Sequence, residues 1–282
     1  MKTFNRISIV LILTLAGLSF LLASGKKSDG LKYPKAKKVA QVDNYHGVKV
    51  ADPYRWLEDP DSDDTRAWVK AENAVTFGFL ETIPERSRIS ARVTELWDYE
   101  KYGVPFKKGG RYFYTKNDGL QNQSVLYWVP LLNEKARVLL DPNQLSEDGT
   151  VHLAGMAVSD DGRYLAYGLA TAGSDWNEWK VREIDSGKDL ADHLKWLKFS
   201  GASWTKDSKG FFYSRYPEPK EGAALEDLNF YNKLYYHRIG TPQQEDALVY
   251  ERPDEKKWGF DGEVSEDGDY LIVSIWKGTD DR

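Results

Sequence analysis

The stretch DDGRYLAY at residues 160–167 joins an acidic, glycine-containing turn to a run of aromatic and aliphatic side chains. Glycine readily supplies the positive φ of a tight hairpin turn, and the side chains that follow favour a β-strand. The same pattern returns at GGRYFY (109–114), DSKGFFY (207–213) and EDGDYLIV (266–273). The glycines aligned by this pattern, at positions 110, 162, 210 and 268, recur at intervals of about 50 residues, which is typical of β-propeller blades.

Further strand candidates lie between these turns, at residues 126–129, 138–140, 180–184, 233–236 and 247–250. About four strands per period would form one blade, a small twisted antiparallel sheet. A β-sandwich would show frequent turns without this longer period. The sequence therefore predicts a mostly β fold, in which residues 103–282 form an incomplete propeller of about three and a half blades.

Residues 26–102 have a different pattern. The segment from 25 to about 45 is polar and is predicted to be a solvated leader. Beyond it, apolar side chains recur every three or four residues in two successive runs, which predicts a pair of helices over residues 62–98. These runs consist of Trp68, Ala71, Val75, Phe79 and Ile83, and then Ile89, Val93, Leu96 and Trp97. Their apolar faces need burial against something larger than the pair itself.

An acidic run precedes the first predicted helix. Asp59, Asp61 and Asp63 alternate as in a calcium-binding EF-hand loop, but the loop's twelfth position is occupied by Lys70 rather than a glutamate. Carboxylates also stabilise the positive end of a helix dipole, and residues 61–64 supply candidates for its cap. We therefore expect a helix start here, and no metal site is predicted in the chain.

The first 25 residues have the pattern of an export signal. Lys2 and Arg6 precede an apolar stretch at residues 7–22, and Ala23-Ser24-Gly25 provides the small residues of a cleavage site. An uncleaved membrane anchor is the alternative, although the apolar stretch is shorter than the span of about 20 residues that a membrane requires. The prediction is a periplasmic or secreted protein with no membrane association after cleavage.

The composition excludes several classes of function. The chain has no cysteine, which rules out disulfides, thiolate catalysis and cysteine zinc sites. Its 39 basic and 44 acidic side chains leave no basic excess for binding nucleic acid. No cofactor is predicted.

Seven ordered segments carry a family resemblance: YHG (45–47), DPYRWLEDP (52–60), GRYFY (110–114), GLQNQSVLY (119–127), AYGL (166–169), GSDW (173–176) and KLYYH (233–237). Through them, residues 33–282 resemble the N-terminal part of the prolyl oligopeptidases, serine endopeptidases that cut short peptides after proline. The resemblance implies a seven-bladed propeller that caps an α/β-hydrolase domain. It also implies that the segment before the propeller, including the helices at 62–98, would pack on that missing domain.

No catalytic residue is predicted within the chain. The nucleophilic serine of an α/β-hydrolase lies in a Gly-x-Ser-x-Gly turn, and this pattern is absent from residues 1–282. The four histidines, at positions 46, 152, 193 and 237, are interpreted as hydrogen-bonding structural residues rather than general bases. In the family, the serine, aspartate and histidine all follow the propeller.

Four residues are candidates for substrate binding. By resemblance, Phe199 in KFS (198–200) supplies an aromatic side chain to the pocket for residues preceding the proline, although a core position at a blade edge is equally consistent with the sequence. Asp175 in GSDW would position the substrate electrostatically or, alternatively, cap a turn. Trp276 and Thr279 fall where the family places further cavity residues.

Two functions of different class remain open. The first is part of an exported serine peptidase for proline-containing oligopeptides, whose partner would be the missing hydrolase domain. The second is a stand-alone extracytoplasmic propeller that binds peptides or proteins without chemistry. The segment at residues 52–60 favours the first, because in the family it belongs to the catalytic-domain side.

Overall fold

The computed structural model describes residues 30–131, 133–220 and 229–278. The chain divides into two compact units, Met1–Val93 and Thr94–Arg282, which are described separately. The predicted export signal at residues 1–25 and the site candidate Thr279 lie outside the described residues. Among the residues that are described, no helix is both long and apolar enough to cross a membrane.

The first unit begins with a short hairpin that the sequence analysis missed. Strand β1 (Val42–Tyr45) pairs antiparallel with β2 (Val48–Ala51), so the predicted solvated leader ends earlier than residue 45. His46 and Gly47 make the turn at φ values of 53° and 91°. The side-chain oxygen of Asn44 accepts a hydrogen bond from the Gly47 amide at 2.8 Å, which stabilises this turn although the strands are mostly exposed.

The acidic run starts a helix, as predicted. After the 3₁₀ turn η1 (Arg55–Glu58), α2 (Asp63–Glu81) begins at the cap residue Ser62, whose hydroxyl accepts a hydrogen bond from the Thr65 amide at 3.3 Å. Thr65 is buried and donates its own hydroxyl hydrogen to the Trp56 carbonyl at 3.0 Å. This start of the helix is therefore tied to the turn that precedes it.

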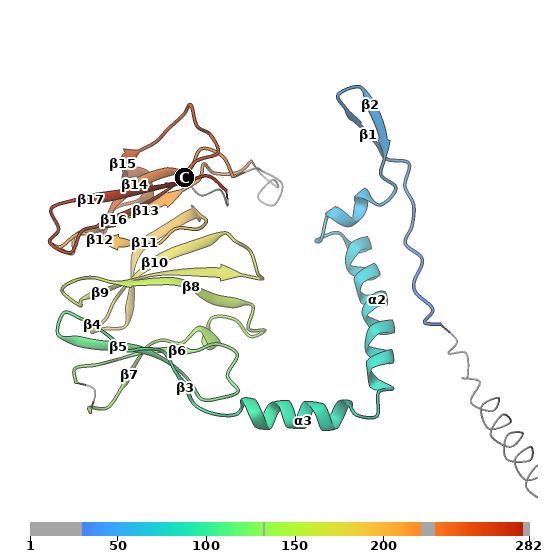
Figure 1. Ribbon diagram of the computed structural model, residues 1–282, viewed down its shortest axis with the longest axis horizontal. Coiled ribbons are helices and arrows are strands. Elements are labelled where there is room, and N and C mark those ends of the chain that lie inside the picture. Colours follow the sequence, from blue (N-terminus) through green and yellow to red (C-terminus); the bar gives the residue numbers. More distant parts are fainter. Residues whose placement is uncertain (1–29, 132, 221–228, 279–282) are drawn as a thin grey trace, which may run out of the picture. The chain divides into compact units, whose positions relative to one another are not determined.

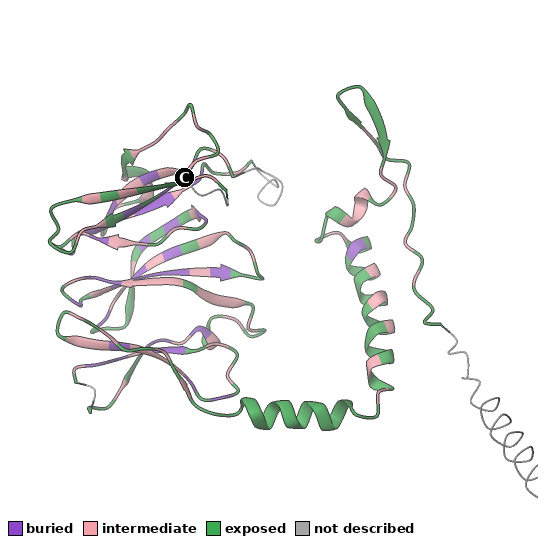
Figure 2. Ribbon diagram, viewed as in Figure 1, coloured by how far each residue is buried: buried purple, intermediate pink, exposed green. Residues whose placement is uncertain are grey.

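The two predicted helices are present, and much of their apolar surface is exposed. Helix α3 (Arg86–Trp97) has no buried residue, and Figure 2 shows it exposed along its length. Its predicted face of Ile89, Val93, Leu96 and Trp97 is 54–61% exposed. Two phenylalanines of α2 are about half exposed. The need for a larger surface, inferred from the sequence, remains unmet within the described residues.

The second unit consists of four antiparallel sheets that follow one another in chain order (Figure 1). The first contains β3 (Lys101–Tyr102), β4 (Phe106–Lys108), β5 (Arg111–Asn117), β6 (Val125–Val129) and β7 (Arg137–Leu140). The second contains β8 (Val151–Val158), β9 (Tyr164–Thr171), β10 (Asn177–Glu183) and β11 (Lys188–Leu197). The third contains β12 (Ser203–Trp204), β13 (Gly210–Arg215), β14 (Lys233–Arg238) and β15 (Ala247–Tyr250), and the fourth contains β16 (Gly259–Val264) and β17 (Leu271–Trp276). Two further 3₁₀ turns are η2 (Pro142–Gln144) and η3 (Gln243–Glu245). The sheets form a partial propeller that is not closed.

Apolar side chains of neighbouring sheets form the core. One cluster joins the first and second sheets and includes Phe113, Trp128, Leu165 and Tyr167. A second cluster joins the second and third sheets and includes Trp179 and Phe211. Each sheet thus buries its faces mainly against the next sheet along the chain, as propeller blades do.

The turns that open the repeats have one recurring geometry, which corrects the sequence alignment at one position. The amides of Ser159, Thr205 and Ser265 each donate to a carbonyl five residues later, at 2.9–3.0 Å. The residue with positive φ in these turns is Gly162, Ser208 or Gly268, at 69°, 56° and 83°. Gly210 was aligned with the turn glycines, but it is the first residue of β13, and Ser208 occupies the turn position.

Gly210 is nevertheless required, for a different reason. A Cβ atom at this position would overlap the carbonyl oxygen of His237 and would lie 2.5 Å from the hydroxyl oxygen of Tyr236. These groups belong to β14, which pairs with β13. The glycine therefore permits close approach between two strands.

Candidate functional site

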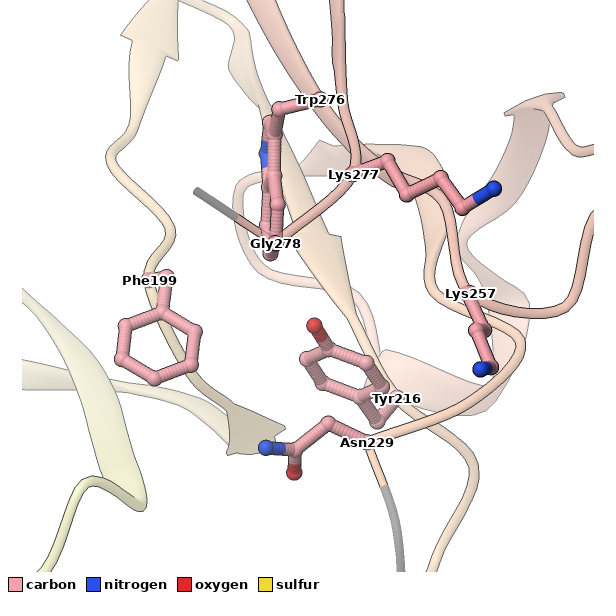
Figure 3. A pocket seen from close by; sticks show the side chains of 7 residues that line it. All are labelled: Phe199, Tyr216, Asn229, Lys257, Trp276, Lys277 and Gly278. Atoms are coloured by element: carbon pink, nitrogen blue, oxygen red, sulfur yellow. The ribbon is translucent and has the colours of Figure 1, made fainter. Parts of the chain in front are cut away.

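Seven residues of the third and fourth sheets and their connections line a pocket of about 520 Å³ (Figure 3): Phe199, Tyr216, Asn229, Lys257, Trp276, Lys277 and Gly278. Phe199 follows β11, Tyr216 follows β13 and Trp276 ends β17. The rings of Phe199 and Trp276 meet edge to face with their centroids 6.3 Å apart. The structure thus brings together two of the four residues that the sequence nominated.

Phe199 is a surface residue of this chain. Its side chain is 56% exposed, so it does not have the core position that the sequence left open as an alternative. Its backbone has a φ of 55°, and nearby Trp196 also has a positive φ, of 65°. Left-handed conformations are uncommon for bulky residues, and they gather at functional sites. The backbone here holds the aromatic ring at the edge of the pocket.

Trp276 is positioned by the strand opposite. It pairs with Gly259 across β16 and β17, and a Cβ atom at Gly259 would overlap the indole ring. The glycine therefore leaves the space in which the ring lies across the neighbouring strand. In this position the indole meets the Phe199 ring edge to face.

Lys198 is part of the site, and the sequence analysis did not nominate it. Its side chain is buried, and its ammonium lies 4.0 Å from the centroid of the Trp176 ring. It donates a hydrogen bond to the side-chain oxygen of Asn229 at 3.0 Å, and Trp176 packs edge to face on Tyr216. Burial lowers the pKa of Lys198, against the opposing effect of the Asp175 charge. Lys198 thus supports two residues of the pocket from behind. The only sequence signal was its place beside Phe199 in the KFS segment.

Asp175 lies in a second pocket, of about 400 Å³, which also contains His152, Ser174 and Ser200. Phe199 lines both pockets, so the two pockets adjoin at this residue. In the turn at GSDW, the Ser174 hydroxyl accepts a hydrogen bond from the Trp176 amide at 3.1 Å. Asp175 is thus a neighbour of the first pocket rather than part of its lining.

His237 has the structural role that its sequence context indicated. Its ring is fully buried, with Nε2 2.9 Å from an Asp192 oxygen and Nδ1 2.7 Å from an Asp246 oxygen. Asp192 also accepts from the Gly240 amide, and the Tyr213 hydroxyl donates to Asp246 at 2.6 Å. Burial lowers the pKa of His237, but the hydrogen bonds to the two carboxylates outweigh this effect and raise it to about 9. We call these four side chains the His237 network.

The described lining of the first pocket offers groups suited to contact with a ligand, but it contains no serine and no histidine. Aromatic, amide and ammonium groups provide apolar contact, hydrogen bonds and positive charge. A nucleophile with an adjacent general base, which acyl transfer requires, is not among the lining residues. Across the described residues, no group of three or more histidines and carboxylates could hold a metal ion.

Comparison with known proteins gives a consistent result. Residues 34–282 match the family model described as the prolyl oligopeptidase N-terminal β-propeller domain. A prolyl endopeptidase from Elizabethkingia meningoseptica is 41% identical over 98% of this chain, and prolyl oligopeptidase A from Galerina marginata is 36% identical over 87%. These matches cover 38% and 37% of the relatives' own lengths, so the chain spans well under half of each.

Solved structures agree with the sequence comparison. Prolyl oligopeptidase B from Galerina marginata, bound to a 25mer macrocyclization substrate, matches 88% of this chain and 37% of its own with a TM-score of 0.73 and 32% identity. A prolyl endopeptidase structure matches 88% of this chain and 35% of its own, with 40% identity and a TM-score of 0.60. The incomplete ring of sheets, its aromatic pocket and the match over residues 34–282 lead to one conclusion: the chain belongs to the prolyl oligopeptidase family and carries its N-terminal propeller region.

Proposed function

We propose that this chain is the propeller-containing part of an exported prolyl oligopeptidase, a serine endopeptidase that cleaves short peptides on the carboxyl side of proline. Its catalytic α/β-hydrolase domain would be encoded beyond residue 282. The observation that carries the proposal is the family match over residues 34–282, combined with the 41% identity to a prolyl endopeptidase of which this chain covers 38%. We use "the complete protein" for the product read through that following sequence.

Within the complete protein, the chain would contribute to substrate binding rather than to bond cleavage. A serine of the catalytic domain would attack the prolyl carbonyl while a histidine carries the proton to the leaving amine. The Phe199 and Trp276 rings would hold an apolar residue that precedes the proline. Contacts of this kind accelerate cleavage when they place the scissile bond against the nucleophile.

The alternative of a stand-alone binding propeller has less support. The four apolar residues of α3 are all more than half exposed, and contiguous exposed apolar surface typically marks an interaction site. A catalytic domain packed on α2 and α3 would cover this surface. A propeller that acts alone has no use for it.

Two reagents test the proposal: a chromogenic peptide that contains proline and a serine-directed fluorophosphonate probe. We expect the complete protein to cleave the peptide and to be labelled, because only the hydrolase domain would supply the nucleophile and the oxyanion hole. The 282-residue chain should do neither. A complete protein without either activity would contradict the proposed function, and labelling of the 282-residue chain would contradict the assignment of catalysis to the following sequence.

Export is part of the same proposal and rests on the residues at positions 1–25. The basic start, the apolar stretch and Ala23-Ser24-Gly25 support cleavage before Lys26. Mass spectrometry of protein recovered from outside the cytoplasm should then find a chain that begins at Lys26. An intact N-terminal segment in that fraction would support the membrane-anchor alternative instead.

A further inference from the structure

We propose that Lys257 and Lys277 make the pocket selective for peptides that carry an acidic side chain on the N-terminal side of the proline. The inference rests on the proposed function and refines it, because it names a preferred class of substrate. It concerns the two charged residues that line the pocket, which neither the sequence analysis nor the proposed apolar subsite used.

The charge of the pocket is opposite to that of the chain. The chain as a whole has 44 acidic and 39 basic side chains. The described residues that line this pocket nevertheless include two lysines and no carboxylate. In Figure 3 both lysines lie on the side of the pocket opposite Phe199. If the apolar side chain of a bound peptide contacts Phe199, the neighbouring residues of that peptide would therefore lie beside the two lysine ammonium groups.

A third lysine adds to the positive charge around the pocket. Lys198 is buried behind the pocket and donates its hydrogen bond to Asn229, one of the lining residues. Lys277 directly follows Trp276 at the end of β17 and is half-buried, so the strand restricts where it can lie. Positive groups at the rim and behind the lining favour a negative ligand and disfavour a positive one.

The two pockets that share Phe199 differ in charge. The first contains Lys257 and Lys277, whereas the second contains Asp175 and neither lysine nor arginine among its described lining residues. A peptide that places an apolar side chain against Phe199 would meet positive charge on one side and negative charge on the other. The position of a charged residue relative to that apolar residue should therefore decide how well the peptide binds.

The size of the expected effect follows from the exposure of the lysines. Ion pairs at a protein surface are weak, so two partly exposed lysines should give about a fivefold preference for an acidic peptide over its neutral equivalent. Dissolved salt screens such pairs, because the Debye length falls from about 30 Å at 0.01 M to about 3 Å at 1 M ionic strength. The preference should accordingly decline as salt is added.

The experiment measures kcat/KM of the complete protein on pairs of peptides that differ only in Glu or Gln. The glutamate is placed in turn at each of several positions before the proline. The parent protein should prefer the Glu peptide at one position at least. The double variant Lys257→Gln/Lys277→Gln should lose that preference, and the double variant Lys257→Arg/Lys277→Arg should keep it.

The neighbouring residue provides a matched control. Lys256 carries the same charge one position away, but its ammonium lies 4.6 Å from the centroid of the Phe230 ring and it is not among the pocket's lining residues. Lys256→Gln should therefore keep the Glu preference. Loss of the preference in this control would contradict the assignment to the pocket, because it would show a general effect of charge.

The outcomes separate this inference from the function on which it rests. If the parent cleaves the Glu and Gln peptides equally at every position, the selectivity is wrong and the proposed function stands. A preference that survives in Lys257→Gln/Lys277→Gln would overturn the role of these lysines. Cleavage of neither peptide by the parent would contradict the proposed function itself, and the selectivity with it.

Discussion

Phe199 has a backbone conformation that is unfavourable for a residue with a Cβ atom, by about 1–3 kcal/mol where the surroundings enforce it. Phe199 has a φ of 55° and directly follows the buried Lys198 in the chain. The Lys198 ammonium lies over the Trp176 ring and donates a hydrogen bond to Asn229. A buried lysine and an exposed aromatic ring are thus neighbours in the chain, at a residue with a left-handed backbone.

Replacing Phe199 by alanine in the complete protein should lower kcat/KM by about tenfold for peptides with a bulky apolar residue before the proline, which is the scale of a lost pocket contact. Peptides with glycine at that position should be affected less. The variant Phe199→Tyr retains the ring and is the matched control. Equal kcat/KM for the alanine variant and the parent on bulky peptides would assign Phe199 a purely structural role.

Gly210 should tolerate no side chain, because β13 and β14 approach too closely there. Gly210→Ala forces a shift in a packed sheet, and overpacking of this kind costs about 1–3 kcal/mol. The thermal unfolding midpoint of the complete protein should fall. Gly201→Ala is the control, since a Cβ atom at 201 meets nothing within 4 Å and the backbone there has no positive φ. Equal midpoints for the two variants would contradict the close approach.

At the scale of elements, the His237 network joins neighbouring sheets through charge rather than through apolar contact. Asp192 lies on β11 of the second sheet, whereas His237 and Tyr213 lie on β14 and β13 of the third. Asp246 follows η3 and completes the link. Removing one partner of such a buried set leaves an uncompensated charge, which is strongly destabilising.

The network makes stability depend on pH at both extremes. The pKa of His237 is raised to about 9 in the folded protein, so its contribution is complete below the ordinary histidine pKa and is lost as pH rises through about 9. Burial raises the pKa of Asp192, but hydrogen bonds from His237 and the Gly240 amide outweigh this and lower it, so its contribution is lost only in acid.

Thermal unfolding measured across pH should show this dependence. The midpoint of the parent should fall as pH rises through about 9, because the imidazolium then loses its proton. His237→Gln should have a lower midpoint at neutral pH and should lack this alkaline fall. His193→Gln is the control, because the His193 ring lies at an exposed position, where its Nε2 contacts Glu178. An alkaline fall of the same size in His237→Gln would assign it to other groups.

The sequence predicted strands where the local pattern is clear. Strands β5, β9, β13 and β17 were predicted because aromatic and aliphatic residues follow a turn, and runs of strand-favouring residues between these turns predicted β6, β7, β10, β14 and β15. Strands β8 and β11 were missed for physical reasons. β8 contains Gly155, which a Trp179 ring approaches closely, and β11 places the charged Asp192 at a buried position. Neither contact can be read from the local sequence.

The candidate site was predictable only in part, and by resemblance rather than by pattern. Phe199 and Trp276 came from matching the family's segments. Tyr216, Asn229 and Lys257 lie far from them in the sequence, and no local pattern indicates that these residues share a pocket. The role of Lys198 depends on contacts with Trp176 and Asn229, which only the folded chain brings together.

At the scale of the whole molecule, the last sheet differs from those before it. The fourth sheet contains two described strands, and Tyr270, Ile272 and Ile275 are 70%, 55% and 43% exposed. By contrast, Leu165 of β9 and Phe211 of β13, in the complete sheets, are at most 1% exposed. An apolar strand without a partner sheet offers a surface on which other chains can pair.

The 282-residue chain by itself should therefore associate or remain loosely packed. Size-exclusion chromatography with light scattering should find species larger than a monomer of 32.3 kDa, and thermal unfolding should be broad. The complete protein should associate less and unfold over a narrower temperature range, because further blades would cover β17. A single monomeric species of the 282-residue chain with a sharp transition would contradict this expectation.

Within the part of the second unit that the structure describes, each sheet is built from strands that follow one another in the chain, and this bears on how the protein is made. Each of the first three sheets can be completed when its last strand leaves the ribosome, and the second and third sheets each share an apolar cluster with the sheet synthesised just before. The order of synthesis is therefore also the order of stacking. Once Tyr250 has left the ribosome, all strands of the first three sheets are available to pair and stack while translation of the remainder continues.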